Sequence, residues 1–191
     1  MVRAEATWLA QSVQGLYEKR PRDPNMKASS FKAIAGPDAR VLILGTLPGA
    51  ASLAASQYYA HPRNAFWAIM GELVGAAVTL PYEERIHRLV ERRVALWDVC
   101  ASASRSGSLD TAIQPASVLP NDIGEFLSSH NDVRLICFNG VKAAELFRRL
   151  VLPELKPAGS RIRRLTVPST SPAYAAMSLK KKIEAWREAL G

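Results

Sequence analysis

The sequence predicts an α/β fold, a three-layer α/β/α sandwich around a short, mostly parallel sheet of four strands. Four short apolar runs, of the kind that forms strands buried on both faces, alternate with segments of helical periodicity. Two of these runs end at a glycine, where a strand gives way to a loop. The chain has 191 residues, of which 48% are hydrophobic, which is enough for one well-buried domain and few for two.

The first half of the chain predicts three helices and two strands. Residues 5–19 have the pattern of an amphipathic helix, and a loop follows. Residues 39–46 (ARVLILGT) are a continuous apolar run and therefore a buried strand. Apolar side chains recur at helical spacing over residues 64–77. Residues 82–93 (YEERIHRLVERR) form the next helix, and residues 94–99 (VALWDV) form the second buried strand.

The second half repeats the alternation. Residues 121–130 begin with an Asn-Asp pair, which is typical of a helix N-cap. Residues 133–140 (VRLICFNG) are the third strand, and the helical pattern of residues 141–150 follows at once. Residues 163–170 (RRLTVPST) are the fourth strand, and residues 178–190 form a closing helix. Strands separated by helices indicate a mostly parallel sheet covered on both faces.

The pattern indicates one domain over residues 1–191. Residues 1–38 would be an N-terminal helix and loop, and residues 39–191 the α/β core; no repeat, low-complexity tract or convincing linker divides them. No apolar run reaches the span of a bilayer, and the first residues lack the apolar centre of a signal peptide, so we expect a cytoplasmic monomer. Cys100 and Cys137 lie in apolar runs and are expected to be buried free thiols, with no metal site.

The charge of the chain favours a polyanionic partner. Lys and Arg number 25 against 17 Asp and Glu, a formal net charge of +8, and they cluster in residues 160–169 and 178–187. Each phosphate that a basic side chain neutralises releases condensed counterions, which drives binding to nucleic acid. A basic soluble enzyme with a small substrate would have the same charge, so this observation leaves both open.

The most informative residues follow the four strands. A parallel sheet brings the carboxyl ends of its strands to one edge, where ligands bind. The segments that would meet there are GTLPGAAS, WDVCASASRSGSLD, FNGVKAAE and PSTSPAYAAMS. The first has a glycine-rich turn whose N–H groups can hold an anion or a carbonyl oxygen, but it is neither a Walker loop nor a dinucleotide fingerprint.

These segments resemble the uracil-DNA glycosylase superfamily, and within it most closely the DNA-deoxyinosine (hypoxanthine-DNA) glycosylases. Residues 45–67 are similar to that family's first motif, a Gly-x-x-Pro-Gly followed by Ser, an aromatic pair and Pro-x-Asn-x-Phe-Trp. The mismatch-specific uracil-DNA glycosylases share the same frame. VPSTSPAYA, residues 167–175, resembles the superfamily's Ser-Pro loop, which grips the DNA backbone and fills the hole left by the extruded base. The resemblance covers residues 39–191.

The resemblance implies how the base is held. Tyr59 matches the aromatic residue that stacks on the extruded base, and Tyr58 would point the other way if this stretch is locally extended. Alternatively, both tyrosines pack on the neighbouring helix. Backbone donors at Gly45, Thr46 and Leu47 would hold an oxygen or nitrogen of the departing base.

The resemblance also implies how the attacking water is held. Many members of the superfamily have Asp or Asn at the third position of the first motif, where this chain has Leu47. In the deoxyinosine branch the later asparagine, here Asn64, is expected to position the water; its alternative role is a helix N-cap. His61 is a second-ranked general base, with a structural hydrogen-bonding role as its alternative. Asp98 would accept from the N1–H of hypoxanthine, orient the water, or cap the segment that follows it.

Further residues are candidates for contacts with base and backbone. Asn139 would read a base edge or stabilise the turn before Gly140. The candidate phosphate contacts are Arg63, Arg105, Ser169, Thr170, Ser171 and residues 180–182, of which Lys180 is the first, while Pro172 would stiffen the loop. For the lysines, a solvated surface is the alternative.

We therefore expect a monofunctional DNA glycosylase of base excision repair, without metal or cofactor. It would act on double-stranded DNA with a deaminated base, flipping out and excising hypoxanthine first and uracil second. No suitably placed lysine follows the first motif to act as an amine nucleophile. The alternatives are a uracil- or mismatch-directed glycosylase of the same superfamily and a catalytically silent nucleic-acid-binding domain.

Overall fold

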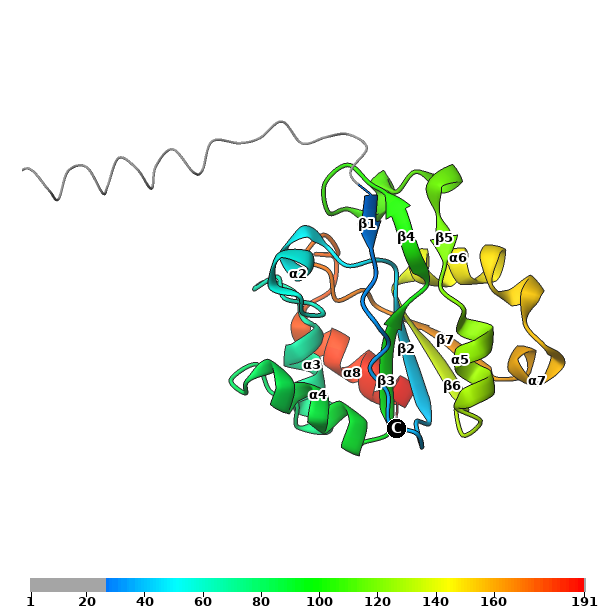
Figure 1. Cartoon of the computed structure of the whole chain (residues 1–191). Helices are drawn as coiled ribbons and strands as arrows, with labels where there is room; N and C mark the ends of the chain where they lie inside the picture. Colours follow the sequence, from blue (N-terminus) through cyan, green and yellow to red (C-terminus); the bar gives the residue numbers. More distant parts are fainter. Residues whose placement is uncertain (1–26, 191) are drawn as a thin grey trace, which may run out of the picture.

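A four-stranded parallel sheet forms the centre of the molecule (Figure 1). The structure is a computed structural model that describes residues 27–190. The strand order is β3-β2-β6-β7, and every neighbouring pair is parallel. The four strands are β2 (Val41–Gly45), β3 (Val94–Asp98), β6 (Leu135–Asn139) and β7 (Arg163–Val167). The predicted α/β class and the four predicted strands are confirmed, although β7 ends before residues 168–170, which form a loop.

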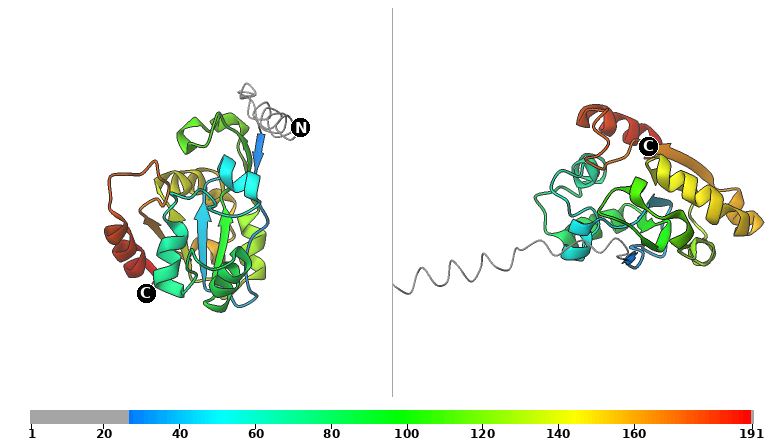
Figure 2. Two further views of the ribbon diagram at one scale, coloured as in Figure 1. Left: turned by 90° about the vertical axis from the view of Figure 1, so that its left-hand side faces the viewer. Right: turned by 90° about the horizontal axis from the view of Figure 1, so that it is seen from above.

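The helices cover both faces of this sheet (Figures 1 and 2). Strand β2 shows why, since Leu42 and Leu44 are buried in one core cluster and Ile43 in the other. The first cluster also contains residues of helices α5 and α6, and the second contains residues of α3, α4 and α8. The helices are α2 (Ala50–Ala55), α3 (Phe66–Val74), α4 (Tyr82–Glu91), α5 (Ile123–Ser129), α6 (Val141–Leu150), α7 (Pro157–Ser160) and α8 (Leu179–Leu190).

A second, smaller sheet was not predicted from the sequence. Its antiparallel order is β1-β4-β5, with β1 (Lys27–Ser29), β4 (Cys100–Ser104) and β5 (Leu119–Pro120). Strand β4 follows β3 after the single residue Val99 and carries the chain beyond the edge of the main sheet. Its sequence, CASAS, has no branched or aromatic side chain, so propensity favours a loop, and pairing with its neighbours overrides that preference. Short 3-10 turns complete the described chain at Asp110–Ala112, Pro115–Ser117 and Leu152–Glu154.

Two further expectations concern the N-terminal helix and membrane-spanning segments. The predicted helix over residues 5–19 lies outside the described residues. Within residues 27–190, no helix is both long enough and apolar enough to cross a membrane.

The register of the sheet places two residues of interest side by side. Gly45, the last residue of β2, is the Cα partner of Asp98, the last residue of β3. Asn139 ends β6 and pairs with Val167 at the end of β7. All four strands therefore finish at one edge of the sheet, as the sequence predicts.

Trp186 holds the closing helix α8 against the second core cluster. Its side chain is fully buried, and its ring meets Phe66 of α3 edge-on with centroids 6.1 Å apart. Its indole Nε1 donates a hydrogen bond to the carbonyl oxygen of Pro168 at 2.9 Å. Since Pro168 begins the loop that follows β7, this one side chain positions both α8 and that loop.

Replacing Trp186 by alanine should lower the free energy of unfolding by about 3–5 kcal/mol, because a large buried ring is lost and a cavity remains. Trp186→Phe should cost less, since it keeps most of the volume and loses the hydrogen bond to Pro168. Denaturation by urea would measure both, with Leu179→Ala, an exposed position on the same helix, as the control. A cost below about 1 kcal/mol for Trp186→Ala would contradict the anchoring role.

Candidate active site

A cavity of about 740 Å³ opens at the carboxyl edge of the main sheet. It is lined by the ends of β2, β3 and β6, by the chain between α2 and α3, and by the loops after β4 and β7. Most residues that the sequence singled out line this one cavity. They are Gly45, Thr46, Leu47, Tyr59, His61, Arg63, Asn64, Asp98, Asn139, Ser169, Thr170, Ser171 and Pro172.

Asp98 is a buried carboxyl group in the wall of this cavity. The residue is 2% exposed, and burial raises the pKa of its side chain to about 7. The Ser30 hydroxyl donates to Oδ2 at 2.9 Å, which opposes the rise. The Tyr58 hydroxyl also faces the carboxyl group, outside good hydrogen-bonding geometry. A carboxyl group in this state can exchange a proton with a ligand near neutral pH.

The glycine at position 45 is a steric requirement of the site. A Cβ atom there would lie 2.6 Å from Asp98 Oδ1 and 2.9 Å from the Tyr59 hydroxyl oxygen. Both contacts are shorter than real Cβ contacts, so any other residue would push one of these polar groups away. The first motif therefore starts with glycine because the two side chains that face the cavity meet across it.

Tyr59 lines the cavity with one side of its ring already packed. It stacks on Phe66 of α3 with centroids 4.0 Å apart and an interplanar angle of 21°. Its backbone is left-handed, with φ of 55°, so the chain at this point is a tight turn and not a strand. The expectation that Tyr58 points the other way is therefore wrong: the two rings lie 6.2 Å apart, and Tyr58 lines the same cavity.

Asn64 and His61 both hold the turn that leads into α3. Asn64 Oδ1 accepts a hydrogen bond from the Phe66 N–H at 3.0 Å, so the helix-capping alternative is present in the structure. His61 Nδ1 accepts from the Arg63 N–H at 3.1 Å, which is the structural alternative for this residue. Both side chains nevertheless line the cavity, and an amide oxygen retains a second lone pair for a water molecule.

Asn139 is clamped to the loop after β7, which we name the Ser-Pro loop (residues 168–174). Its Nδ2 donates to Thr170 Oγ1 at 2.8 Å, and its Oδ1 accepts from the Thr170 N–H at 2.9 Å. Asn139 therefore holds the loop after β7 and not the turn before Gly140, which was its structural alternative, and its reading of a base edge stays a prediction. Thr170 is 1% exposed, and its hydroxyl serves this clamp, which corrects the expectation that it contacts a phosphate.

The rest of the Ser-Pro loop is held by its own short hydrogen bonds. Ser169 Oγ accepts from the Ser171 N–H at 3.2 Å, and Ser171 Oγ accepts from the Ala173 N–H at 3.3 Å. Gly140, which faces this loop, has φ of 97°, and a Cβ there would lie 3.0 Å from Ser169 Cβ. The loop is therefore held in place as a wall of the cavity, and its serine hydroxyls retain hydrogen-bonding capacity for a partner.

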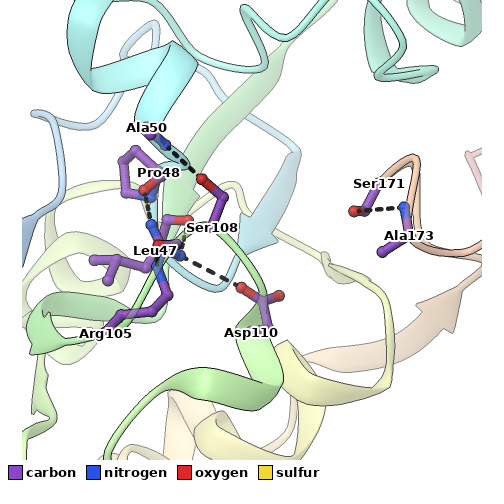
Figure 3. Close-up of polar contacts among 9 residues, drawn as sticks. Leu47, Pro48, Ala50, Arg105, Ser108, Asp110, Ser171 and Ala173 are labelled. Carbon is purple, nitrogen blue, oxygen red and sulfur yellow. Dashed lines mark hydrogen bonds and ion pairs between the residues drawn. The ribbon is translucent and has the colours of Figure 1, made fainter. Parts of the chain in front are cut away.

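Arg105 anchors a second wall, which we name the Arg105 loop (residues 105–111). The guanidinium group is buried, at 3% exposure of the residue, and donates to the carbonyl oxygens of Leu47, Pro48 and Gly107 (Figure 3). The expectation that Arg105 contacts a DNA phosphate is therefore wrong. Buried arginines need such partners for each N–H group, and these bind the loop to the first motif.

Asp110 is a site residue that the sequence analysis missed. It lines the cavity, and its Oδ1 lies 3.7 Å from the Arg105 guanidinium (Figure 3). Burial raises the pKa of its carboxyl group, while the Thr46 hydroxyl, which faces it, and Arg105 oppose the rise. Its side chain is only partly buried, so solvent moderates this effect. A signal was available, since SGSLD follows the second strand like the other site segments.

Lysines occupy two different environments near the site. Lys142, which the sequence analysis passed over, lines the cavity 3.5 Å from the Glu145 carboxylate. Lys182 is buried, and its Nζ donates to the Tyr174 carbonyl oxygen at 2.8 Å, which corrects its assignment as a phosphate contact. Lys180 is exposed on α8 and is not among the residues that line the cavity.

Three buried hydroxyl groups in the cavity wall have unused hydrogen-bonding capacity. The oxygens of Thr46, Tyr58 and Tyr59 are inaccessible to solvent and have no hydrogen-bond partner among the described residues. Buried polar groups are nearly always paired, and exceptions mark sites where a ligand supplies the partner. The cavity wall also carries an aromatic ring and two carboxyl groups, which suit a flat heterocycle with hydrogen-bond donors.

Comparisons with known proteins agree with this geometry. The family model of the uracil DNA glycosylase superfamily matches residues 31–190. A hypoxanthine DNA glycosylase of Methanosarcina barkeri is 31% identical over 165 residues, which cover 86% of this chain and 98% of that protein. A hypoxanthine DNA glycosylase of Methanosarcina acetivorans is 35% identical over 155 residues, 81% of this chain and 92% of that protein.

A solved structure shows the same fold. The solution NMR structure of a candidate uracil DNA glycosylase from Methanosarcina acetivorans superposes with a TM-score of 0.69 at 31% identity. The match covers 87% of this chain and 100% of that one. Residues 31–190, which the family model matches, include both walls of the cavity and every strand of the main sheet. This chain therefore belongs to the uracil DNA glycosylase superfamily.

Proposed function

We propose that this protein is a monofunctional DNA glycosylase that excises deaminated bases from double-stranded DNA, hypoxanthine first and uracil second. Membership of the superfamily and the two relatives named hypoxanthine DNA glycosylase support the reaction class. The observation that carries the proposal is the buried carboxyl group of Asp98 in the wall of the cavity. We also propose that the protein acts as a monomer in the cytoplasm, and at the nucleoid if the organism is a prokaryote.

A carboxylate is suited to detecting deamination. Loss of the amino group converts adenine, whose N1 is an acceptor, into hypoxanthine, whose N1 carries a hydrogen. The same change gives uracil an N3–H where cytosine has an acceptor. Ionised Asp98 accepts from such an N–H, whereas it would face a lone pair of adenine or cytosine, which is repulsive. One acceptor therefore separates hypoxanthine and uracil from adenine and cytosine, the bases from which they arise.

The other side chains fit around a base held in this way. Tyr59, supported from behind by Phe66, offers a flat surface on which the extruded base stacks, which returns ~1–3 kcal/mol of the stacking lost from the duplex. The Thr46 and Tyr58 hydroxyls lie behind the cavity surface and face the Asp110 and Asp98 carboxyl groups, respectively. Backbone N–H groups at Gly45, Thr46 and Leu47, which line the cavity, are the proposed donors to the negative charge that develops as the base departs.

Hydrolysis requires a water molecule at C1′ of the deoxyribose. The C1′–N9 bond of deoxyinosine breaks, its electron pair leaves with the base, and the water oxygen bonds to C1′ while a proton passes to solvent or to a carboxylate. We assign the positioning of this water to Asn64. Asp110 brings a carboxyl group beside Thr46, one residue from Leu47, and so supplies acidity near the position where many superfamily members have Asp or Asn.

The proposed reaction leaves an intact abasic site. Lys142 is a lysine that lines the cavity, but its amine is ion-paired with Glu145. An amine held in this pair is not presented to C1′ as a free nucleophile, so no covalent Schiff base is expected. Arg63, Ser171 and Lys180 are the proposed contacts with the phosphates that flank the extruded nucleotide.

The test is an excision assay with the purified protein. Duplexes with one inosine, uracil or xanthine are incubated, treated with heat and alkali, and examined for strand cleavage. Cleavage of the inosine strand, only after alkali, is the expected result. Faster release of uracil than of hypoxanthine would instead favour a uracil-directed enzyme, and no release from any duplex would favour a silent DNA-binding domain.

Asn64→Ala should lower single-turnover excision of hypoxanthine on the order of 100-fold, because the water loses its anchor. Asn64→Asp should retain substantial activity. Asn64→Ser separates the two roles of this residue, since serine can preserve the turn before α3 but does not replace the amide. Excision by Asn64→Ser at the wild-type rate would mean that Asn64 only caps the helix. Affinity for a duplex with an uncleavable inosine analogue should change little in each variant.

Asp98 should make excision depend on pH. Its folded-state pKa is about 7, so the carboxylate that accepts the base N–H is lost as pH falls below this value, and single-turnover excision should fall with it. Asp98→Asn presents a neutral acceptor and should flatten the profile between pH 6 and 8, on the order of one unit either side of that value. Asp98→Ala should reduce excision roughly 10- to 100-fold, the effect of one charged hydrogen bond. An unchanged pH profile in Asp98→Asn would place the titrating group elsewhere.

Asp98→Asn should also change the stability of the folded protein, and the change should depend on pH. The pKa of Asp98 rises on folding from 3.8 to about 7, so the folded state favours the protonated form. Its contribution is complete below pH ~4 and is lost as pH rises through ~7. Asp98→Asn should therefore have a higher Tm than the wild type at pH 8, and the difference should shrink towards pH 4.

A further inference from the structure

The edge of the main sheet opposite the cavity carries a row of arginines. This is the edge where the four parallel strands start, at the lower end of the sheet in Figure 1. Every strand has an exposed arginine there, and we name the set the arginine row. Its members are Arg40 directly before β2, Arg93 directly before β3, Arg134 directly before β6 and Arg163 at the start of β7.

Main-chain hydrogen bonds hold three of these arginines side by side. The Arg40 N–H donates to the Arg93 carbonyl oxygen at 2.8 Å, and the Arg134 N–H donates to the Arg40 carbonyl oxygen at 2.9 Å. Neighbouring strands lie about 4.8 Å apart, so the three side chains leave the backbone at roughly this spacing. Like charges at such distances repel one another, and a partner with several negative charges relieves that repulsion.

The protein itself supplies little opposing charge to the arginine row. The acidic residues in the segments that lead into the four strands are Asp38, Glu91 and Asp132. Asp38 Oδ2 accepts from Arg93 Nε at 2.8 Å, whereas Glu91 lies 3.7 Å from Arg88 on its own helix, α4. Within residues 27–190, no ion pair involves Arg40, Arg134 or Arg163. These three cations are therefore available to a partner.

The composition of this surface fits a nucleic acid better than a protein. Protein interfaces are centred on aromatic and other large apolar side chains. None of the large, exposed apolar side chains of residues 27–190 lies in the segments that lead into the four strands. A nucleic acid requires only a line of cationic groups, because its phosphates repeat at short and regular intervals.

The arginine row lies too far from the cavity to contact the DNA that the cavity binds. Each strand of the main sheet has five residues, about 17 Å, and this length separates the two edges. A short duplex that places a base in the cavity lies across the carboxyl edge, and the row faces the opposite way. The row is therefore suited to a different segment of nucleic acid.

We propose that the arginine row binds a second segment of duplex DNA while the cavity holds the damaged base. The inference rests on the proposed function, which makes DNA the polyanion that this protein meets. With two binding faces, the protein bridges two segments and passes from one to the other without release into solvent. The arginines of the row bind phosphates and take no part in excision.

The test is the capture of a second duplex by protein that is bound to a first. The first duplex is short and immobilised and carries an uncleavable inosine analogue, and the second is undamaged, labelled and in solution. The wild type should capture the second duplex with an affinity that falls steeply as salt rises. The double variant Arg40→Gln with Arg134→Gln should lower the slope of log affinity against log salt by about 1.8, or about 0.9 for each lost phosphate contact. It should excise hypoxanthine from a short duplex at the wild-type rate.

The double variant Lys27→Gln with Lys32→Gln is the control of equal charge. Both lysines are exposed and lie outside the row, so capture and its salt dependence should stay as in the wild type. No excision by the wild type would refute the proposed function itself. An active wild type that captures no second duplex would overturn only the second site, and so would equal capture by the Arg40→Gln, Arg134→Gln variant.

A competition experiment separates DNA from an acidic protein as the partner of the row. Unlabelled duplex DNA should displace the captured duplex at a lower concentration of negative charge than polyglutamate does, because its phosphates are regularly spaced. Displacement by polyglutamate at the lower concentration would overturn the proposal in favour of an acidic protein.

Discussion

The site depends on the close approach of three elements around Gly45. The parallel pairing of β2 with β3 sets Asp98 directly beside this residue, and the left-handed turn at Tyr59 brings a phenol to its other side. Neither group could occupy its place if position 45 had a side chain. Burying the Asp98 carboxyl group and holding Tyr59 at positive φ both cost free energy. The packing of the sheet and helices beneath them offsets this cost. The absence of a side chain at position 45 is therefore a requirement for the arrangement of Asp98 and Tyr59.

Buried polar side chains then fix the walls of the cavity. Arg105 bonds to main-chain carbonyl groups of the first motif, Asn139 bonds to both polar groups of Thr170, and Trp186 bonds to the carbonyl group of Pro168. Each is a long or planar side chain whose polar groups bond to another segment, and in the Ser-Pro loop this adds to the loop's own short hydrogen bonds. Preorganised walls are what a reaction that relies on positioning requires.

The sequence predicted the sheet and the motif residues because both follow from local patterns. Continuous apolar runs identified β2, β3 and β6, whereas β7 (RRLTV) is a largely exposed edge strand that begins with two arginines. The rule that parallel strands end at one edge of the sheet brought the site segments together. Strand β4 was missed because small residues do not signal a strand. The roles of Arg105 and Thr170 were wrong because an arginine or a threonine in a loop reads as exposed, and only tertiary contacts show that it is buried. The direction of the Tyr58 side chain was not predicted because Tyr59 turns the chain. Tyr59 has a positive φ, which no sequence pattern reveals.

The way Arg105 is bound has a consequence for how such a protein changes over time. Its partners at Leu47, Pro48 and Gly107 are main-chain carbonyl groups, so the anchor is indifferent to which side chains those positions carry. A substitution at Leu109 or Thr111, which line the cavity and whose side chains make none of these bonds, therefore leaves the anchor in place. The outline of the cavity can thus change at these positions while the loop keeps its attachment to the first motif.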